Sequence, residues 1–343
     1  MRARRGERGV VLVMVLVLAL LLVGSIATFE RRAVVDAVIS RNRENTLRAE
    51  ALARGGVELA KALVLEDELR ESGAGQGLDT QLDPWHRARD SSWPVGGGSV
   101  RLAIRDTGEL LNLNAVLNAR QGDQISPHAK PFLVSLLQKV IDDLALPPEE
   151  ATAYDPDQLA DNLIDFADPD QERQQGGAEA AWYQQQDPPL RPNDHALLSV
   201  EELRLVEGFD GRLARALASY VTVYPYAGTE GVNLNTAPPH VLALVFSNDG
   251  VDYQLAKEDV VKKVVAAREG GKLICGQTVG SEGCVPISEI VTNSQGIFPP
   301  PTYSTDIFLV EVQATIGDVV RTVEAVIDRG DPLEPRLLSW RMR

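Results

Sequence analysis

The sequence predicts an α+β protein in which a long N-terminal helix packs on a small antiparallel sheet, with a large all-α domain inserted in that sheet. Three observations predict this fold. Residues 10–70 contain no proline and carry apolar residues near helical spacing. An alternating strand pattern occurs at 99–107. The pattern returns at 306–327, where Gly317 and Asp318 form the turn between two strands. Between them, mainly helical patterns fill the chain, which at 343 residues is long enough for two domains.

The first thirty residues combine a basic leader with an apolar run. Residues 1–9 carry four arginines and one glutamate, and residues 10–29 contain no charged side chain over 20 positions. At ~1.5 Å per residue, a helix of this length spans ~30 Å, the thickness of the hydrocarbon core of a bilayer. The arginines should stay on the cytoplasmic side, which places the chain after residue 29 on the far side.

Three interpretations of this segment are open. A cleavable secretory signal usually has a shorter apolar run of ~7–15 residues and a small-residue cleavage site, which is not evident here. A plain signal anchor would keep the leader. The third interpretation follows from the boundary, because Gly9 closes the leader and Val10 opens the apolar run without a gap. This boundary resembles the processing site of type IV pilins and pseudopilins, which implies cleavage by prepilin peptidase between Gly9 and Val10 and methylation of the new N-terminus.

Further features narrow this resemblance to one subclass. The fifth position after the junction is Met14, where most of the family has a glutamate that pairs with a neighbouring subunit. The K-type minor pseudopilins of type II secretion systems share this departure. They also resemble this chain in the N-L-N-T-A-P phrase at 233–238 and in the S-x-x-E-L-R-L-V phrase at 199–206. The resemblance covers nearly the whole chain.

The resemblance implies a pilin-like organisation with an insertion. Its parts are a leader peptide (1–9), the transmembrane part of the helix (10–29), the first part of the pilin-like domain (30–113), an inserted helical domain with helical hairpins (114–300) and the second part of the pilin-like domain, a strand hairpin and tail (301–343). The helix is expected to continue to about residue 70. A kink at Gly55 and Gly56 is the alternative to a straight helix, since each glycine destabilises a helix by ~1 kcal/mol relative to alanine. Residues 71–98 are rich in Gly, Asp and Pro and are expected to form a loop.

Two helices of the insertion are predicted from apolar stripes at 131–144 and 157–167. Ser199 and Glu202 have the spacing of a capping box, and the glycine turn at 208–211 then gives a helical-hairpin outline. Hairpins of this kind can bind DNA phosphates, but this turn carries Glu207 and Asp210. The net charge of −15 and the 5% aromatic content also argue against a nucleic-acid partner. A structural hairpin is the simpler interpretation.

An acidic stretch is the strongest candidate for a ligand site. Twelve acidic residues and only two arginines lie between 155 and 202, a density that favours either a solvated face or a bound cation. With Asp168 as position 1, a Ca²⁺-type ladder of oxygen side chains falls at positions 3, 5, 7 and 12, which are Asp170, Glu172, Gln174 and Glu179. Position 6 is Arg173 instead of the glycine of an EF-hand, so a calcium loop of another kind is expected.

The resemblance strengthens the calcium prediction. K-type pseudopilins hold structural calcium in the inserted domain, and their acidic D-x-D and G-G-A-E run matches Asp168, Asp170 and residues 176–179. The family usually has another acidic residue after this glutamate, where this chain has Ala180, so the number of ions stays open. Further candidate ligands are Asp165, Asp187 and Asp194.

The two cysteines, Cys275 and Cys284, lie nine residues apart in a glycine-rich segment. On the outer side of a bacterial inner membrane, a disulfide closing this loop is expected. A metal pair or a catalytic thiol is the alternative, and no histidine lies close in sequence to support it. No triad, phosphate loop or other catalytic motif stands in a usable context, so an enzyme is not expected.

The resulting functional hypothesis is a non-enzymatic subunit at the tip of the type II secretion pseudopilus, helping to start pseudopilus assembly and protein export across the outer membrane. The resemblance implies I- and J-type minor pseudopilins as partners through the N-terminal helix, and contact with secreted substrates or the outer-membrane channel. It places the chain in the bacterial inner membrane as a single-pass protein, with its bulk in the periplasm. The alternative is a signal-anchored periplasmic calcium-binding or adhesion module that does not assemble.

Overall fold

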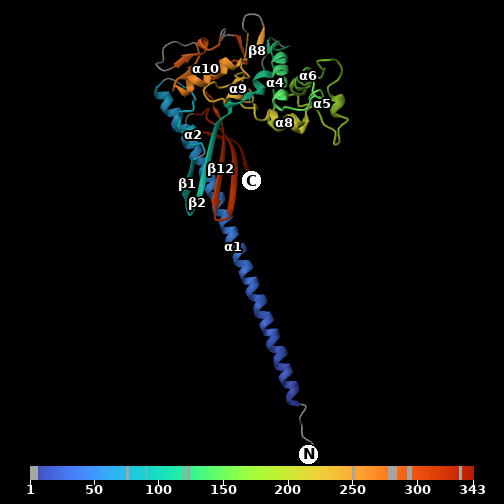
Figure 1. Ribbon diagram of the computed structural model, residues 1–343, viewed down its shortest axis with the longest axis vertical. Helices are drawn as coiled ribbons and strands as arrows, with labels where there is room; N and C mark the ends of the chain where they lie inside the picture. The colour runs from blue at the N-terminus through green and yellow to red at the C-terminus, as the bar shows by residue number, and fades with distance from the viewer. Residues whose placement is uncertain are drawn as a thin grey trace, which may run out of the picture.

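The computed structural model describes residues 7–74, 77–89, 91–118, 120–121, 124–248, 252–276, 284–291, 296–331 and 334–343. It has the shape of a head on a stalk: the helix α1 (Glu7–Ala74) extends from the head as a single rod, with the sheet beside its upper part and the inserted domain beyond the sheet (Figure 1). The fold predicted from the sequence is therefore confirmed. Of the predicted leader, residues 1–6 lie outside the described residues.

α1 runs without a break through Gly55 and Gly56. Gly56 faces the sheet, where an added Cβ would lie 2.4 Å from Cγ1 of Val312, whereas nothing lies within 4 Å of the Cβ position of Gly55. Gly56 therefore allows a close approach of the helix to the sheet. The helix buries mainly small side chains there, including Ala49, Ala53 and Ala60.

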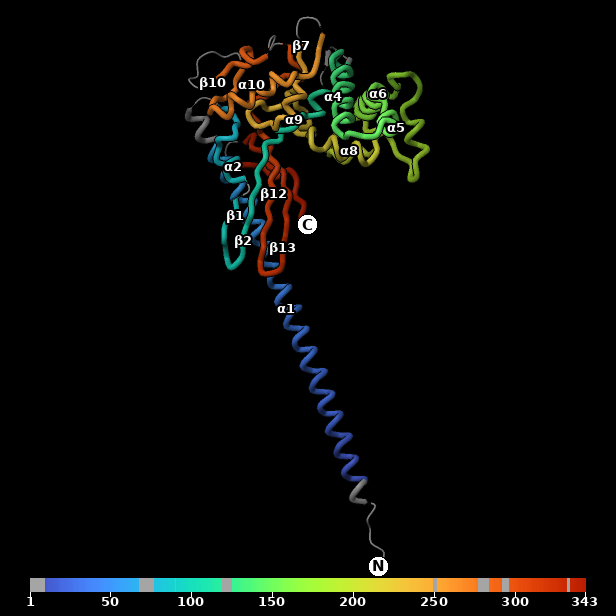
Figure 2. Tube along the Cα trace, in the orientation of Figure 1, coloured from blue at the N-terminus to red at the C-terminus, as the bar shows by residue number. Residues whose placement is uncertain are grey.

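The sheet has five antiparallel strands in the order β1-β2-β12-β13-β14. Their bounds are β1 (Ser91–Val95), β2 (Gly98–Asp106), β12 (Ile307–Ile316), β13 (Val319–Asp328) and β14 (Arg336–Met342). β2 pairs directly with β12, with Leu102 opposite Val312, so the sheet closes around the long insertion between these two strands. Figure 2 shows the two segments side by side, with β12 and β13 in red next to β2 in blue-green.

Alternation along the strands builds the core beneath α1. Leu102, Phe308, Val310 and Val312 point to the same face of the sheet and are at most 1% exposed. They pack with Ala53, Val57 and Ala60 of α1 in one cluster. Burying these side chains on the stalk holds the sheet against the helix.

The inserted domain has its own core, which is separate from the core under α1. Its helices are α3 (Leu113–Leu117), α4 (Ala129–Asp143), α5 (Pro148–Ala151), α6 (Pro156–Ala167), α7 (Ala180–Tyr183), α8 (Gly211–Leu217), α9 (Pro239–Leu242) and α10 (Glu258–Glu269). The described residues also form the short 3₁₀ helices η1 (Thr107–Glu109), η2 (Val200–Leu205) and η3 (Ile287–Glu289). The predicted helices at 131–144 and 157–167 correspond to α4 and α6, which pack on each other.

Short strands in the insertion were not predicted. They are β3 (Leu111–Asn112), β4 (Arg120–Gln121), β5 (Gln124–Ile125), β6 (Val221–Thr222), β7 (Phe246–Asn248), β8 (Tyr253–Leu255), β9 (Leu273–Cys275), β10 (Cys284–Pro286) and β11 (Ile297–Phe298). With two or three residues each, they are too short to show an alternating pattern in sequence. They form small two- and three-stranded sheets between the helices.

Three local predictions were wrong. Residues 71–98 are not one loop, since they hold the end of α1, the helix α2 (Pro84–Arg87) and β1, which is joined to β2 by Gly96 and Gly97 at positive φ. The predicted tail contains β14. Ser199 makes no capping hydrogen bond with its side chain. Instead, the Glu202 carboxylate accepts hydrogen bonds from Leu198 N and Asn193 Nδ2.

A buried polar junction joins the sheet to the insertion. Asp106, the last residue of β2, is 1% exposed, and its carboxylate accepts hydrogen bonds from Thr236 Oγ1 (2.7 Å), Asn233 Nδ2 (2.7 Å) and the backbone N–H of Gly108. Beside it, Arg329 at the end of β13 donates to Asp79 at 2.8 Å. Burial raises the pKa of the Asp106 carboxyl above its ordinary value.

The adjacent glycines Gly55 and Gly56 of α1 give a matched test of the stalk-to-sheet contact. Gly56→Ala should destabilise the fold by about 1–3 kcal/mol, because the new methyl group overlaps Val312. Gly55→Ala should leave stability unchanged or raise it by up to ~1 kcal/mol, since alanine favours the helix and meets open space. Urea unfolding followed by circular dichroism measures both, and equal effects of the two variants would contradict the close packing at Gly56.

Candidate metal centre and stalk surface

α6 positions the first acidic side chains of the candidate metal centre. Asp155 caps the helix by accepting the backbone N–H groups of Asp157 and Gln158, and Pro156 occupies its first turn. Leu159, Leu163 and other apolar residues of α6 are buried in the inserted core. The helix ends at Ala167 and Asp168 is its C-cap residue, so Asp165 and Asp168 lie about one turn apart at its C-terminal end.

The loop after α6 folds back and brings Glu179 to this helix end. Gly176 and Gly177 both have positive φ, and the backbone N–H of Arg173 donates to Gly177 O. The backbone of Glu172 pairs with that of Ala178 as an isolated antiparallel bridge. As a result, one carboxylate oxygen from each of Asp165, Asp168 and Glu179 lies within 4.8 Å of the others, and all three residues are buried.

The electrostatics of this carboxylate group favour a bound cation. Burial and then the charges of Asp168 and Asp165 raise the pKa of the Glu179 carboxyl to about 8. Burial also raises the pKa of Asp165. Among the described residues, neither carboxylate oxygen of Glu179 has a hydrogen-bond partner. Buried carboxylate oxygens in this arrangement are ligands that Ca²⁺ takes, so the residues fit a calcium ion.

Asp161, a neighbouring buried carboxylate, differs from Glu179 because a lysine pairs with it. Asp161 lies one turn before Asp165 on α6 and is 2% exposed. Its carboxylate pairs with Lys130 Nζ at 2.6 Å and accepts a hydrogen bond from Gln175 Nε2 at 3.0 Å. Asp161 is therefore neutralised by a side chain of α4, whereas the described contacts give Glu179 no such partner.

The structure brings together only part of the predicted ligand ladder. Asp168 and Glu179 meet, and Asp165 joins them. Asp170, Glu172 and Gln174 are exposed. Asp170 Oδ1 accepts the N–H of Glu172, and Gln174 reaches the centre only through its backbone N–H, which donates to Asp165 Oδ1.

The two remaining candidates lie further along the loop. Asp194 is exposed, yet its charge contributes to the raised pKa of Glu179. Glu179 and Asp194 line a cleft of about 310 Å³ that also includes Arg191. Asp187 is exposed and does not line this cleft, so the structure does not place it at the centre.

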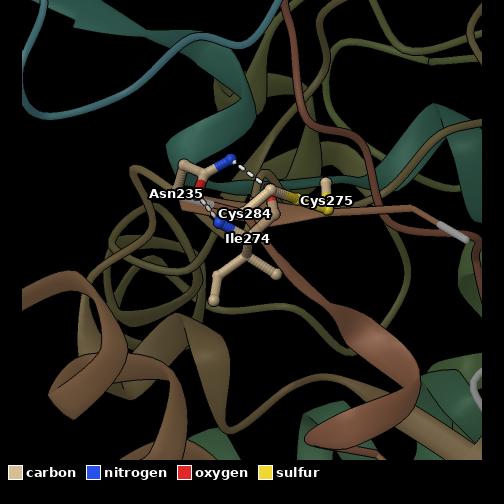
Figure 3. Close-up of a disulfide and its surroundings, with 4 residues drawn as sticks. All are labelled: Asn235, Ile274, Cys275 and Cys284. Carbon is tan, nitrogen blue, oxygen red and sulfur yellow. Dashed lines mark hydrogen bonds between the residues drawn. A yellow bond between two sulfur atoms is a disulfide. The ribbon is translucent and has the colours of Figure 1, made fainter. Parts of the chain in front are cut away.

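Two asparagine-containing phrases, at 111–115 and 233–238, hold backbone segments together. Asn235 Nδ2 donates to Ile274 O at 2.9 Å, and Ile274 N donates to Asn235 Oδ1 at 2.7 Å (Figure 3). Asn114 makes the same paired contact with Leu197, donating to its carbonyl and accepting from its N–H. Next to Ile274, Cys275 forms a disulfide with Cys284, with Cα atoms 6.0 Å apart.

The stalk presents an apolar surface to its surroundings. Among the residues that the structure describes, α1 is the one helix long and apolar enough to cross a membrane, and its most apolar window has a mean hydropathy of 3.2 with none of it buried. Beyond the predicted membrane part, Val34, Val35, Val38 and Ile39 remain 43–64% exposed. Val10 and Met14 lie within the same helix.

This fold defines a class: a pilin-like protein with a helical stalk, a small antiparallel sheet on the stalk and an inserted domain. The family model for protein K of the type II secretion system matches residues 109–226. The chain is 31% identical to type II secretion system protein K of Klebsiella pneumoniae, over 70% of this chain and 69% of that protein. It is 30% identical to type II secretion system protein K of Pseudomonas aeruginosa PAO1, over 72% of this chain and 70% of that protein.

A solved structure shares the fold. A chain of the crystal structure of the GspK-GspI-GspJ complex from the type 2 secretion system of enterotoxigenic Escherichia coli matches with a TM-score of 0.63 at 17% identity, over 89% of this chain and 99% of that one. The sequence relatives show the family of this chain, and this structural match agrees with them in the fold. The chain belongs to the protein K family of type II secretion systems, the minor pseudopilin family that its leader and the phrases at 199–206 and 233–238 indicated.

The raised pKa of Glu179 predicts an unusual dependence of stability on pH. In the unfolded chain this carboxyl ionises near its ordinary pKa of 4.5, and in the folded chain near 8. Without metal, the free energy of unfolding should therefore be highest below the lower value and fall as the pH rises through the upper one. Ca²⁺ binds the ionised form, so it should restore stability most strongly at about pH 8.

Thermal unfolding in EDTA and in Ca²⁺ at several pH values measures this effect. In Glu179→Gln, both the pH dependence and the stabilisation by Ca²⁺ should shrink, whereas Asp187→Asn on the same loop should behave as the unaltered chain. A Ca²⁺ effect that survives unchanged in Glu179→Gln would show that the ion does not bind at this group.

Proposed function

We propose that this chain is a structural, non-enzymatic subunit at the tip of the type II secretion pseudopilus. The observation that carries the proposal is the unbroken α1, which joins an exposed apolar membrane segment to the core under the sheet without a flexible linker. A continuous rod of this kind suits bundling with other rods. The large inserted domain lies beyond the sheet, at the end of the molecule opposite the N-terminus (Figure 1).

The position at the tip rests on two features of the chain. Met14 stands where most of the family has glutamate, so this subunit lacks the carboxylate that would pair with the N-terminal amine of a subunit above it. The inserted domain would also block further subunits from adding beyond it. A subunit that can only be first would help to start assembly, and from there it would reach secreted substrates or the outer-membrane channel.

The proposed route to this position begins at the membrane. Prepilin peptidase would cut between Gly9 and Val10, and the new N-terminus would be methylated. Residues 10–29 would anchor the chain in the bacterial inner membrane, with the arginines of the leader on the cytoplasmic side and the head in the periplasm. An oxidising periplasm suits the disulfide between Cys275 and Cys284.

The proposed partners are the I- and J-type minor pseudopilins. The solved relative comes from a complex named GspK-GspI-GspJ, which supports a similar set of partners for this chain. Contact would run along α1, where Ile39, Thr46 and Leu47 line an apolar groove together with Asn42 and Arg43. Removing such apolar surface from water is the main gain when helices associate outside the membrane.

Calcium would serve this subunit as a structural ion. Asp165, Asp168 and Glu179 would hold it, with Asp170 and Asp194 adding negative charge nearby. The ion would supply the positive charge that this buried group needs and would fix the loop between α6 and α7 against the inserted core. No nucleophile lies in this group, so no catalytic step is proposed for it.

A pair of charge substitutions tests whether the stalk assembles. Ile39→Glu should reduce recovery of the I- and J-type pseudopilins with this chain, and secretion of the system's substrates, by about tenfold, because a carboxylate would have to be buried between helices. Leu198→Glu, at a similarly exposed apolar residue of the head, should leave both unchanged. Mass spectrometry of the mature N-terminus gives a second readout, a methylated Val10.

The contrary result is equally clear. An intact leader, together with normal behaviour of Ile39→Glu, would favour a signal-anchored periplasmic calcium-binding module that does not assemble.

A further inference from the structure

The two edges of the five-stranded sheet differ in their capacity to accept another strand. β1, at one edge, has five residues and contains Pro94, which has no N–H to donate. β14, at the other edge, has seven residues and no proline. Long edge strands with free backbone groups are templates for pairing, and proteins usually blunt them as β1 is blunted here.

The register of β14 shows which of its backbone groups face outward. Arg343 and Thr322 of β13 exchange both of their N–H to O=C hydrogen bonds, at 2.8 and 3.1 Å. In an antiparallel ladder the next residue along points its N–H and C=O the other way, so Trp340 and Met342 present theirs to the outer side. Among the described residues, no strand pairs with that side of β14.

The side chains at this edge are apolar and basic. Leu337 and Leu338 are 42% and 45% exposed. Arg336, Arg341 and Arg343 keep 66%, 55% and 58% of their side chains exposed while they pair with Asp328 and Glu324 of β13, which are only 19% and 28% exposed. Residues 335–343 contain no acidic residue, although the whole chain has a net charge of −15. The arginines are therefore the more accessible charges of these ion pairs at this edge.

From this geometry we propose that β14 binds an extended segment of another protein chain as a sixth strand of the sheet. The segment alternates apolar residues with acidic ones, so that its carboxylates lie opposite the exposed arginines and its backbone pairs with Trp340 and Met342. A second copy of this chain fits poorly, because pairing two β14 strands would bring together two edges that carry three arginines each and no carboxylate. The inference does not depend on the position of the chain in a pseudopilus.

Amide hydrogen exchange on the full-length chain in detergent tests the inference. The probe is an eight-residue peptide that alternates glutamate with valine and threonine, and its control has lysine in place of each glutamate. The glutamate peptide should slow exchange at the amides of Trp340 and Met342 by about tenfold or more, because these N–H groups become hydrogen-bonded. The lysine peptide should leave their exchange unchanged.

A matched pair of variants separates edge binding from general charge attraction. Arg341→Gln combined with Arg343→Gln should weaken binding of the glutamate peptide by about tenfold, while keeping the fold, since exposed ion pairs contribute about 0–1 kcal/mol each. Arg101→Gln combined with Arg105→Gln removes two exposed arginines of β2, away from this edge, and should have no effect.

Three results would overturn the inference. They are equal protection by the lysine peptide, absence of protection at Trp340 and Met342, and concentration-dependent protection of these amides without any peptide, which would identify a second copy as the occupant. None of these results bears on whether the stalk assembles, because the stalk variants report on a different surface.

Discussion

The buried carboxylate of Asp106 is the constraint on which the arrangement of the molecule depends. It stands where β2 ends and the insertion begins, and three donors from the chain around it satisfy its oxygens. Two of them, Asn233 and Thr236, come from the middle of the insertion. A buried carboxylate is costly unless it is hydrogen-bonded, so these donors are held in place as firmly as the carboxylate itself. The inserted domain is thereby fixed on the end of the sheet.

Arg329 extends the same junction toward the stalk. It lies at the end of β13, stacks over the ring of Phe308 at 4.9 Å and pairs with Asp67 of α1 and with Asp79. The carboxylate of Asp67 also accepts a hydrogen bond from Trp85 Nε1. Stalk, sheet and insertion thus meet in one desolvated polar network, which transmits the direction of the rod to the head. The tip position that we propose for this chain would need such a rigid connection.

In each half of the insertion an asparagine side chain makes paired hydrogen bonds with a distant backbone segment, and the neighbouring loop is stabilised differently in the two halves. Asn114 holds Leu197 just after the carboxylate loop, and Asn235 holds Ile274 just before the disulfide. In the first half, the segment before Leu197 is rich in carboxylates and suited to an ion. In the second half, the segment after Ile274 is closed covalently.

The parts of the structure that depend on local periodicity could be predicted from the sequence. α1, α4, α6 and the β12–β13 hairpin have strong repeating patterns, and all four were predicted within a few residues. β1 was missed because it is short and contains Pro94, and the junction could not be predicted because its partners are far apart: 130 residues separate Asp106 from Thr236, and 250 separate Asp79 from Arg329.

The candidate metal centre could also be predicted only in part from the sequence. Asp168 and Glu179 followed from their spacing, but the fold-back at Gly176 and Gly177 turns Glu172 and Gln174 outward. Asp165 enters instead, because it lies one helical turn before Asp168.

The most direct test of this account is a distance measurement between the stalk and the head. Electron–electron resonance measures the distance between spin labels attached at the exposed positions Leu47 of α1 and Gln158 of α6 in the full chain. This distance reports on the junction. A junction fixed by Asp106 predicts one narrow distance distribution, which broadens when Asn233 is replaced by alanine. A broad distribution in the unaltered chain would contradict the account, because it would mean that the head moves freely on its stalk.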